Sequence, residues 1–138
     1  MLAEGDKLPQ LTVTDDTGKP VETAALLGGP LVLYFYPKDD TPGCTSEASQ
    51  FRDLYAKFEK KGARIVGVSR DSAASHQKFK DKFKIPFTLL ADTDSKLYTA
   101  FGVSGRSTFL FDASGVVVKV WPKVKVDDHA DEVLASLP

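Results

Sequence analysis

The strongest constraint on the fold is an apolar run that stops abruptly at turn-forming residues. Leu31–Tyr36 is uncharged and rich in aromatic side chains, a pattern that predicts a buried β-strand. Prolines, aspartates, a threonine and a glycine follow the run and end the strand. Apolar residues then recur at helical spacing, so we expect a helix from about Cys44 to Lys60. The chain therefore contains a strand that passes almost directly into a helix.

Similar patterns continue on both sides of this unit. Leu11–Thr14, the turn after it and Val21 predict an N-terminal β-hairpin, and Leu26–Pro30 predicts a helical turn or loop. The other expected strands are Arg64–Ser69, Phe87–Leu90, Ser107–Phe111 and Val116–Trp121. We expect three other helices. The first is capped by Asp71 or Ser72 and runs to about Phe83, the second runs from Asp92 to Gly102, and the last is capped by Asp127 or Asp128. This order is typical of an α/β fold with a mixed central sheet flanked by helices.

Composition narrows the class of protein. With 138 residues, 42% hydrophobic and 27% charged, we expect residues 1–138 to form a single soluble domain. The formal net charge of -1 gives no basis for binding nucleic acid or an anionic membrane. One cysteine excludes an internal disulfide, a CxxC redox pair and a cysteine-rich zinc site. Since we find no secretory signal pattern and no apolar run long enough to span a membrane, we expect a cytoplasmic protein.

Cys44 lies where the expected strand passes into the expected helix. Unpaired backbone N–H groups and the positive end of the helix dipole favour an anion at such a place. A thiol held there ionises more readily, and the thiolate is the nucleophile. The alternative is an inert buried thiol, but Cys44 is surrounded by Gly43, Thr45, Ser46 and Glu47 rather than by apolar residues. Local chemistry leaves both interpretations open and favours the reactive one.

Four other residues can contribute to a site at this end of the sheet, where α/β proteins carry their functional groups. The hydroxyl of Thr41 can reach the sulfur region, although an ordinary turn threonine is the simpler interpretation. Pro37 either closes the loop over the thiol or simply ends the strand. Glu47 would orient a cation rather than act as a base. Arg106 opens a strand, and its guanidinium would support a thiolate and bind an oxygen-bearing substrate.

The remaining polar residues carry less information. The histidines His76 and His129 lie in polar helical contexts, and we expect both to be solvated, with no metal site formed between them. We expect the lysines of the helices, Lys80 among them, to lie on solvated faces.

Taken together, these residues resemble a known family. The pattern Pro37-x-x-x-Thr41-x-x-Cys44-x-x-Glu47 resembles the active-site motif of peroxiredoxins, and Tyr34–Glu47 is similar to their bacterioferritin comigratory protein (PrxQ) branch. Further stretches fit that branch: Gly67–Ser72, Ser75-His76, Pro86–Leu90, Arg106–Leu110, and Lys123–Val126 with His129-Ala130. The resemblance thus covers nearly the whole chain.

The resemblance implies a thioredoxin-like fold and the thiol-dependent reduction of hydrogen peroxide and organic hydroperoxides, without a cofactor. It implies that Cys44 is the peroxidatic cysteine and that Thr41 hydrogen-bonds the peroxide. It also implies that Arg106 polarises the substrate, that Pro37 shields the sulfur and that Glu47 orients the arginine. The backbone N–H groups of Gly43 and Cys44 would assist.

Two departures from the family pattern matter. Many members of the branch have a resolving cysteine five residues after the peroxidatic one, where this chain has Ser49, and others have it in the next helix near Lys80. The segment before Arg106 is also short, only Gly102–Gly105. Because no second cysteine is present, we expect the sulfenic acid to be resolved by an external thiol such as thioredoxin, glutaredoxin or glutathione. Ser49 is either natural or a replacement for a resolving cysteine.

The resemblance makes an antioxidant peroxidase in cell redox homeostasis, acting as a monomer, the leading hypothesis. The competing hypothesis is a thioredoxin-fold binding or chaperone module without turnover, because a fold alone does not determine a function. A cysteine hydrolase is a weaker alternative, because it needs a base near Cys44 and only His76 or His129 is available.

Overall fold

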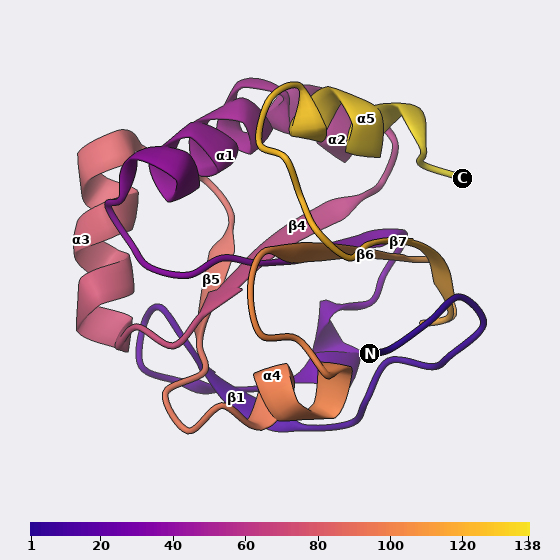
Figure 1. Cartoon of the computed structure of the whole chain (residues 1–138), viewed down its shortest axis with the longest axis horizontal. Coiled ribbons are helices and arrows are strands. Elements are labelled where there is room, and N and C mark those ends of the chain that lie inside the picture. Colours follow the sequence, from indigo (N-terminus) through magenta and orange to yellow (C-terminus); the bar gives the residue numbers. More distant parts are fainter.

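The computed structural model describes residues 1–138 and contains one seven-stranded sheet with helices on both faces (Figure 1). The strands are β1 (Thr12–Asp15), β2 (Pro20–Glu22), β3 (Leu31–Phe35), β4 (Arg64–Ser69), β5 (Thr88–Ala91), β6 (Ser107–Phe111) and β7 (Val117–Trp121). The helices are the 3-10 helix η1 (Thr23–Leu26) and the α-helices α1 (Pro42–Asp53), α2 (Tyr55–Lys60), α3 (Ala73–Phe83), α4 (Lys96–Phe101) and α5 (His129–Ala135).

The sheet is mixed, with strand order β2-β1-β5-β4-β3-β6-β7. The three central strands β3, β4 and β5 run parallel to one another, whereas β6 runs antiparallel to β3 and β1 runs antiparallel to β5. Strand β2 completes the expected N-terminal hairpin, in which Val13 pairs with Val21. The expected α/β class with a mixed sheet is therefore confirmed.

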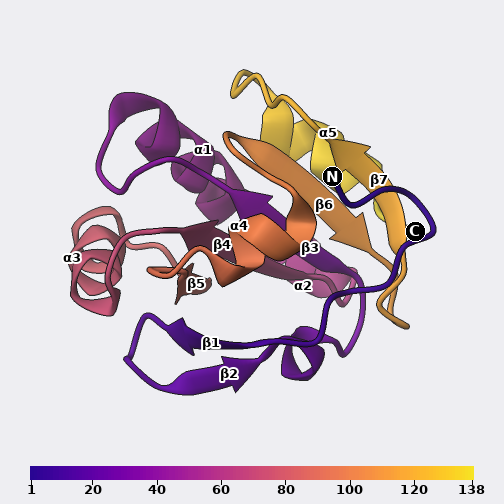
Figure 2. The same ribbon diagram turned by 60° about the horizontal axis from the view of Figure 1, so that its bottom comes forward.

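The central strand β3 explains why helices cover both faces. Its side chains alternate between the two faces of the sheet, and all of them are buried. Val32 and Tyr34 pack beneath α1, α2, α3 and α5, whereas Leu31, Leu33 and Phe35 pack against α4 and the N-terminal segment. Figure 1 shows α1, α2 and α5 together on one side and α4 on the other, and Figure 2 shows α4 crossing the middle of the sheet.

The segment expected as a single helix from Cys44 to Lys60 is interrupted. Helix α1 begins two residues earlier, at Pro42, and ends at Asp53, and α2 starts after Leu54. The amide of Leu54 still bonds to the carbonyl of Gln50, so the chain bends at this residue without losing its hydrogen bonding. The bend lets Phe51 of α1 and Phe58 of α2 both reach the core, with ring centroids 5.9 Å apart. Apolar spacing predicted both buried faces but not the change of direction between them.

The starts of two helices, α4 and α5, differ from the expectation in position or in capping. Helix α4 begins at Lys96 rather than at Asp92, because the buried Asp92 carboxylate accepts hydrogen bonds from the amides of Leu97 and Tyr98. Helix α5 does follow Asp128, but that side chain makes no capping hydrogen bond. Ser72 caps α3 as expected, since its hydroxyl oxygen accepts a hydrogen bond from the amide of Ser75.

Candidate active site

Cys44 is the third residue of α1, just beyond the carboxyl end of β3, and its side chain is buried. Pro42 opens the helix, which costs nothing there because its first N–H groups have no helical acceptor. The first internal bond joins the amide of Thr45 to the carbonyl of Thr41. The N–H groups of Gly43 and Cys44 precede it, so the thiol lies at the positive end of the helix.

Arg106 reaches this thiol from a distant part of the chain. It immediately precedes β6, and the pairing of Ser107 with Phe35 brings the start of β6 beside the end of β3. Its Nη2 donates a hydrogen bond to Cys44 Sγ at 3.3 Å. A Cβ added to Gly43 would lie 3.2 Å from the same nitrogen. The guanidinium is therefore so close to the helix backbone that a side chain at position 43 would crowd it.

Glu47 holds the other end of the guanidinium. It lies one turn after Cys44 in α1, and its Oε1 accepts a hydrogen bond from Arg106 Nη1 at 2.6 Å. Burial raises the pKa of Glu47 to about 7, although the charge and the hydrogen bond of Arg106 work to lower it. The guanidinium keeps its charge, because the attraction of Glu47 and Cys44 outweighs burial and raises the pKa of Arg106. The sequence predicted a carboxylate that orients a cation, but it did not predict that this carboxylate is buried.

Thr41 and Pro37 belong to the loop between β3 and α1. The Thr41 hydroxyl donates a hydrogen bond to the carbonyl of Lys38 at 2.8 Å and makes no bond to the sulfur. Its oxygen can therefore still accept a hydrogen bond from a ligand. Pro37 is exposed at the start of the loop. The structure thus brings Cys44, Arg106, Glu47 and Gly43 together and places Thr41 and Pro37 in the loop that leads into α1.

The two positions considered for a resolving cysteine lie in ordered helices. Ser49 is partly buried in α1, five residues after Cys44. Lys80 lies on α3, but the expectation of a solvated side chain is wrong, because its ammonium pairs with the buried Asp16 at 3.2 Å. A long lysine side chain can lie along the protein surface and still bring its charge to a carboxylate in this way.

The expectation that both histidines are solvated is also wrong. His76 of α3 and His129 of α5 are fully buried. His76 lies between Asp39 and the Leu90 carbonyl, and His129 Nε2 lies 2.8 Å from the hydroxyl oxygen of Thr108. Helical spacing held a signal for this burial, since His76 lies three residues before the buried Phe79 on one helix face.

Asp39, Asp71 and His76 are the group best placed to hold a metal ion, with one potential ligand atom from each within 4.8 Å of the others. Existing contacts occupy these atoms. His76 Nδ1 lies 2.8 Å from Asp39, and Asp71 Oδ2 accepts hydrogen bonds from the Asp39 amide and the Ser69 hydroxyl. A cation would have to displace all of these hydrogen bonds.

The fold and the site together define a class of protein: an α/β protein with one buried cysteine in the first turn of a helix, beside a guanidinium held by a carboxylate. Comparisons with known proteins agree with this class. Residues 4–120 match the model of the AhpC/TSA family. A putative peroxiredoxin bcp of Coxiella burnetii is 44% identical over 96% of this chain and 97% of the relative. Peroxiredoxin Bcp of Bacillus subtilis is 46% identical over 96% of this chain and 93% of the relative.

Solved structures give the same result. A cysteine-to-serine mutant of Xanthomonas campestris peroxiredoxin Q superposes with a TM-score of 0.88 at 45% identity, covering 91% of this chain and 88% of that one. Peroxidoxin BcpB of Mycobacterium tuberculosis superposes with a TM-score of 0.92 at 35% identity, covering 98% and 96% of the two chains. The chain belongs to the AhpC/TSA family, the peroxiredoxins, in their bacterioferritin comigratory protein (PrxQ) branch. Like other peroxiredoxins, it is a thiol-dependent peroxidase.

Two details of the comparisons bear on the departures from the family pattern. The X. campestris protein has been solved with serine in place of either of two cysteines, whereas this chain has only Cys44. The alignment with the C. burnetii relative spans 146 positions, more than the 138 residues present here, so that relative has residues without a counterpart in this chain. None of the helices is long and apolar enough to cross a membrane.

Proposed function

We propose that Cys44 attacks the peroxide at a site formed with Arg106, Glu47, Gly43 and Thr41. The observation that carries the proposal is the guanidinium fork, which contacts Cys44 Sγ at 3.3 Å and Glu47 Oε1 at 2.6 Å at the same time. A planar donor fixed in this way stabilises the thiolate and offers N–H groups to a peroxide oxygen.

The chemical step is a displacement at oxygen. The Cys44 sulfur attacks one peroxide oxygen, so that an S–O bond forms while the O–O bond breaks. The second oxygen leaves as hydroxide or alkoxide and takes up a proton to give water or an alcohol. Two electrons pass from sulfur to the peroxide, and the product on the protein is a cysteine sulfenic acid.

Ionisation of the thiol explains only part of the rate. An unperturbed thiol is only about 3% ionised at pH 7, so full ionisation increases the rate at most ~30-fold. The rest must come from alignment of the peroxide and from stabilisation of the leaving oxygen. In this proposal Arg106 and the N–H groups of Gly43 and Cys44 stabilise the developing charge. Thr41, whose proton is directed to the Lys38 carbonyl, accepts a hydrogen bond from the peroxide.

An external thiol must complete the cycle, because the chain has no second cysteine. The thiol sulfur displaces water from the sulfenic acid and forms a mixed disulfide. A second thiol then releases the Cys44 thiolate and leaves as part of a disulfide. Since Cys44 is only 1% exposed, the first turn of α1 has to open before a protein thiol can reach the sulfur.

The proposal extends to the substrate, the reductant, the oligomeric state and the cellular compartment. We propose that hydrogen peroxide and organic hydroperoxides are the substrates, and a structural study of the X. campestris relative addresses its alkyl peroxide reduction. We propose thioredoxin, glutaredoxin or glutathione as the reductant. We also propose that the protein acts as a monomer in the cytoplasm and contributes to redox homeostasis, although several similar plant proteins are chloroplastic.

The test is hydrogen peroxide consumption, measured with and without added thiol. The wild-type protein should turn over repeatedly with a thiol and consume about one equivalent without it, whereas Cys44→Ser should consume none. Ser49→Ala is the matched control, because it changes the same helix without touching the thiol and should behave as wild type. Continued turnover by Cys44→Ser would overturn the proposed role of Cys44.

A further inference from the structure

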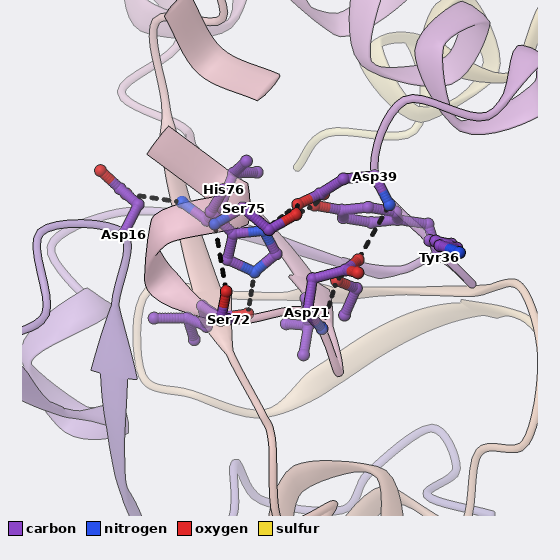
Figure 3. A network of polar contacts seen from close by, with 12 residues as sticks. Asp16, Tyr36, Asp39, Asp71, Ser72, Ser75 and His76 are labelled. Carbon is purple, nitrogen blue, oxygen red and sulfur yellow. Dashed lines mark hydrogen bonds and ion pairs between the residues drawn. The ribbon is translucent and has the colours of Figure 1, made fainter. Parts of the chain in front are cut away.

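A second buried polar network lies beside the catalytic residues, with His76 at its centre (Figure 3). His76 Nδ1 lies 2.8 Å from Asp39 Oδ2, and Nε2 lies 2.9 Å from the Leu90 carbonyl oxygen. A carbonyl oxygen and an ionised carboxylate can only accept hydrogen bonds, and a neutral imidazole has only one N–H. Both contacts are therefore satisfied only if both ring nitrogens carry protons, so the geometry requires an imidazolium.

Asp39 shows the features of an ionised partner. Its carboxylate accepts hydrogen bonds from the hydroxyl of Tyr36 at 2.6 Å and from that of Ser75 at 2.8 Å, besides the contact with His76. Burial works to raise the pKa of Asp39, but the hydrogen bonds from His76, Tyr36 and Ser75 outweigh it and lower the pKa. Burial likewise works to lower the pKa of His76, but the hydrogen bond and charge of Asp39 outweigh it and raise the pKa.

The network joins the catalytic loop to the rest of the fold. Asp39 lies in the loop between β3 and α1, on the same segment as Thr41 and Cys44. His76 belongs to α3, and the Leu90 carbonyl belongs to β5. The imidazolium thus bonds to the loop and to the central sheet at the same time. The Asp71 carboxylate does so too, since it accepts hydrogen bonds from the Asp39 amide and from the hydroxyl of Ser69 in β4. In Figure 3 the side chains of Asp39 and Tyr36 point from the loop toward His76.

We propose that His76 is a positioning residue, whose doubly protonated ring holds the loop of Asp39, and with it Thr41 and the start of α1, in the conformation that reduces peroxide. The proposal rests on the proposed function of Cys44. It assigns no contact with substrate to His76, which acts through Asp39.

The surroundings of His76 predict how this link responds to pH. The charged groups that face it are Asp39 from the loop and Asp71 from the turn before α3, and the titratable Tyr36 faces it from the first position after β3. Strand β5 contributes only the Leu90 carbonyl, and Ser75 is the neighbour on α3. When the ring loses a proton, one of its two acceptors loses its donor. The link is therefore complete while His76 is protonated and Asp39 is ionised, and it weakens as the pH rises through the raised pKa of His76.

The protonation state can be tested on the unmodified protein. Only two histidines are present, and burial lowers the pKa of His129 to about 4. In ¹⁵N NMR spectra at pH 7, one histidine should show two equivalent protonated ring nitrogens, and the other should show one protonated and one bare nitrogen. Assignment by His129→Gln should identify the first as His76. A neutral His76 at pH 7 would overturn the proposal.

The positioning role is tested by His76→Gln, which removes the charge and one ring donor. At pH 7 the rate constant for oxidation of Cys44 by hydrogen peroxide should fall by roughly 100-fold, the effect expected of a misplacement of about 1 Å. The ratio of the wild-type to the variant rate should shrink at alkaline pH, where the wild-type ring is also neutral. For His129→Gln, the matched buried control, the ratio should not depend on pH. A His76→Gln ratio that stays constant with pH would reduce His76 to a structural role and contradict the proposal.

Two further measurements cover other outcomes. If His76→Gln does not fold, Tyr36→Phe removes a different donor from Asp39 and should lower the peroxide rate in the same direction, by about 10-fold. Alkylation of Cys44 by iodoacetamide needs no peroxide chemistry, and it should be faster in the variants because a released loop exposes the sulfur. If the wild-type protein does not react with peroxide, the proposed function of Cys44 is wrong. If the variants are alkylated at the same rate as the wild type, the positioning role of His76 is wrong, whatever the outcome with peroxide.

Discussion

Arg106 is the residue that connects the other two side chains of the site, those of Cys44 and Glu47. One nitrogen contacts Cys44 Sγ, another contacts Glu47 Oε1, and both contacts depend on the planar fork of an arginine. The interaction joins residues 62 positions apart in the sequence, so it exists only in the folded chain.

Arg106→Lys tests the fork separately from the charge. A lysine ammonium is a point charge that cannot make both contacts with the same geometry, so we expect the rate of Cys44 oxidation by hydrogen peroxide to fall by about 100-fold. Arg70→Lys is the matched control, because Arg70 is exposed and bonds only to Ser95 while stacking on Tyr98. A rate for Arg106→Lys within a factor of two of the control would contradict the role of the fork.

Glu47 should give the protein a pH dependence near neutrality. Its pKa is raised by burial from the ordinary value of 4.5 to about 7, so the folded protein binds a proton more tightly than the unfolded chain. Its contribution to the free energy of unfolding is therefore fully present below pH 4.5 and is lost as the pH rises through about 7. Glu47→Gln does not titrate and should gain stability relative to wild type over this interval. Urea denaturation of both proteins at several pH values measures the difference, and a difference independent of pH would contradict the raised pKa.

Two neighbouring tyrosines of the same strand end should respond in opposite ways to loss of their hydroxyl. The hydroxyl of Tyr34 is buried without a partner, whereas that of Tyr36 donates to Asp39 at 2.6 Å. An unpaired buried hydroxyl destabilises a protein, so Tyr34→Phe should raise the free energy of unfolding by about 1 kcal/mol. Tyr36→Phe should lower it by a similar amount or more. Urea denaturation of the pair compares them directly, and destabilisation by Tyr34→Phe would show that its hydroxyl has a partner.

Among the secondary-structure elements, α1 has to serve two purposes. Its first turn holds Cys44 in a buried position. In the proposed mechanism Cys44 reacts with peroxide there, and the same turn then opens for a reducing thiol. Cα atoms five residues apart in a helix are about 8.7 Å from each other, which exceeds the span of a disulfide. A resolving cysteine in place of Ser49 would therefore work only if α1 unwinds.

Ser49→Cys tests whether α1 can open in this way. After one equivalent of hydrogen peroxide, mass spectrometry should show loss of two hydrogens and a peptide that joins residues 44 and 49. Ser46→Cys is the control on the same helix, because a cysteine two positions from Cys44 is poorly placed for a disulfide and should leave the sulfenic product. If Ser49→Cys also yields only sulfenic or sulfinic acid, α1 does not unwind on the reaction pathway.

Apolar patterns predicted most of the elements, because burial of a strand or of a helix face is a property of local sequence. The run Leu31–Tyr36 predicted β3. The interruption of the helix at Leu54 was not predicted, because it depends on where Phe51 and Phe58 meet the core. The neighbours of Cys44 were indicated by the motif that they share with peroxiredoxins. The contact of His76 with Asp39, 37 residues away, left no such local pattern, and polar neighbours in the sequence suggested a solvated ring instead.

For the whole molecule, the single sheet determines where the chemistry takes place. Its two faces bury separate apolar clusters, one under α1, α2, α3 and α5 and one under α4. Because all seven strands belong to the one sheet, we infer that residues 1–138 unfold together, with a single calorimetric transition as the expected result. The first turn of α1, with Cys44, and Arg106, just before β6, meet at one end of this sheet, which is why distant segments form a single site.

The central claim is that peroxide oxidises Cys44 to a sulfenic acid and transfers one oxygen to it. The most direct measurement treats the protein with one equivalent of hydrogen peroxide in the presence of a 1,3-dione that traps sulfenic acids, and records the intact mass. We predict one adduct per chain, located by peptide mapping at Cys44, and no adduct on Cys44→Ser. Unmodified wild-type protein, or an adduct that persists in Cys44→Ser, would contradict the account.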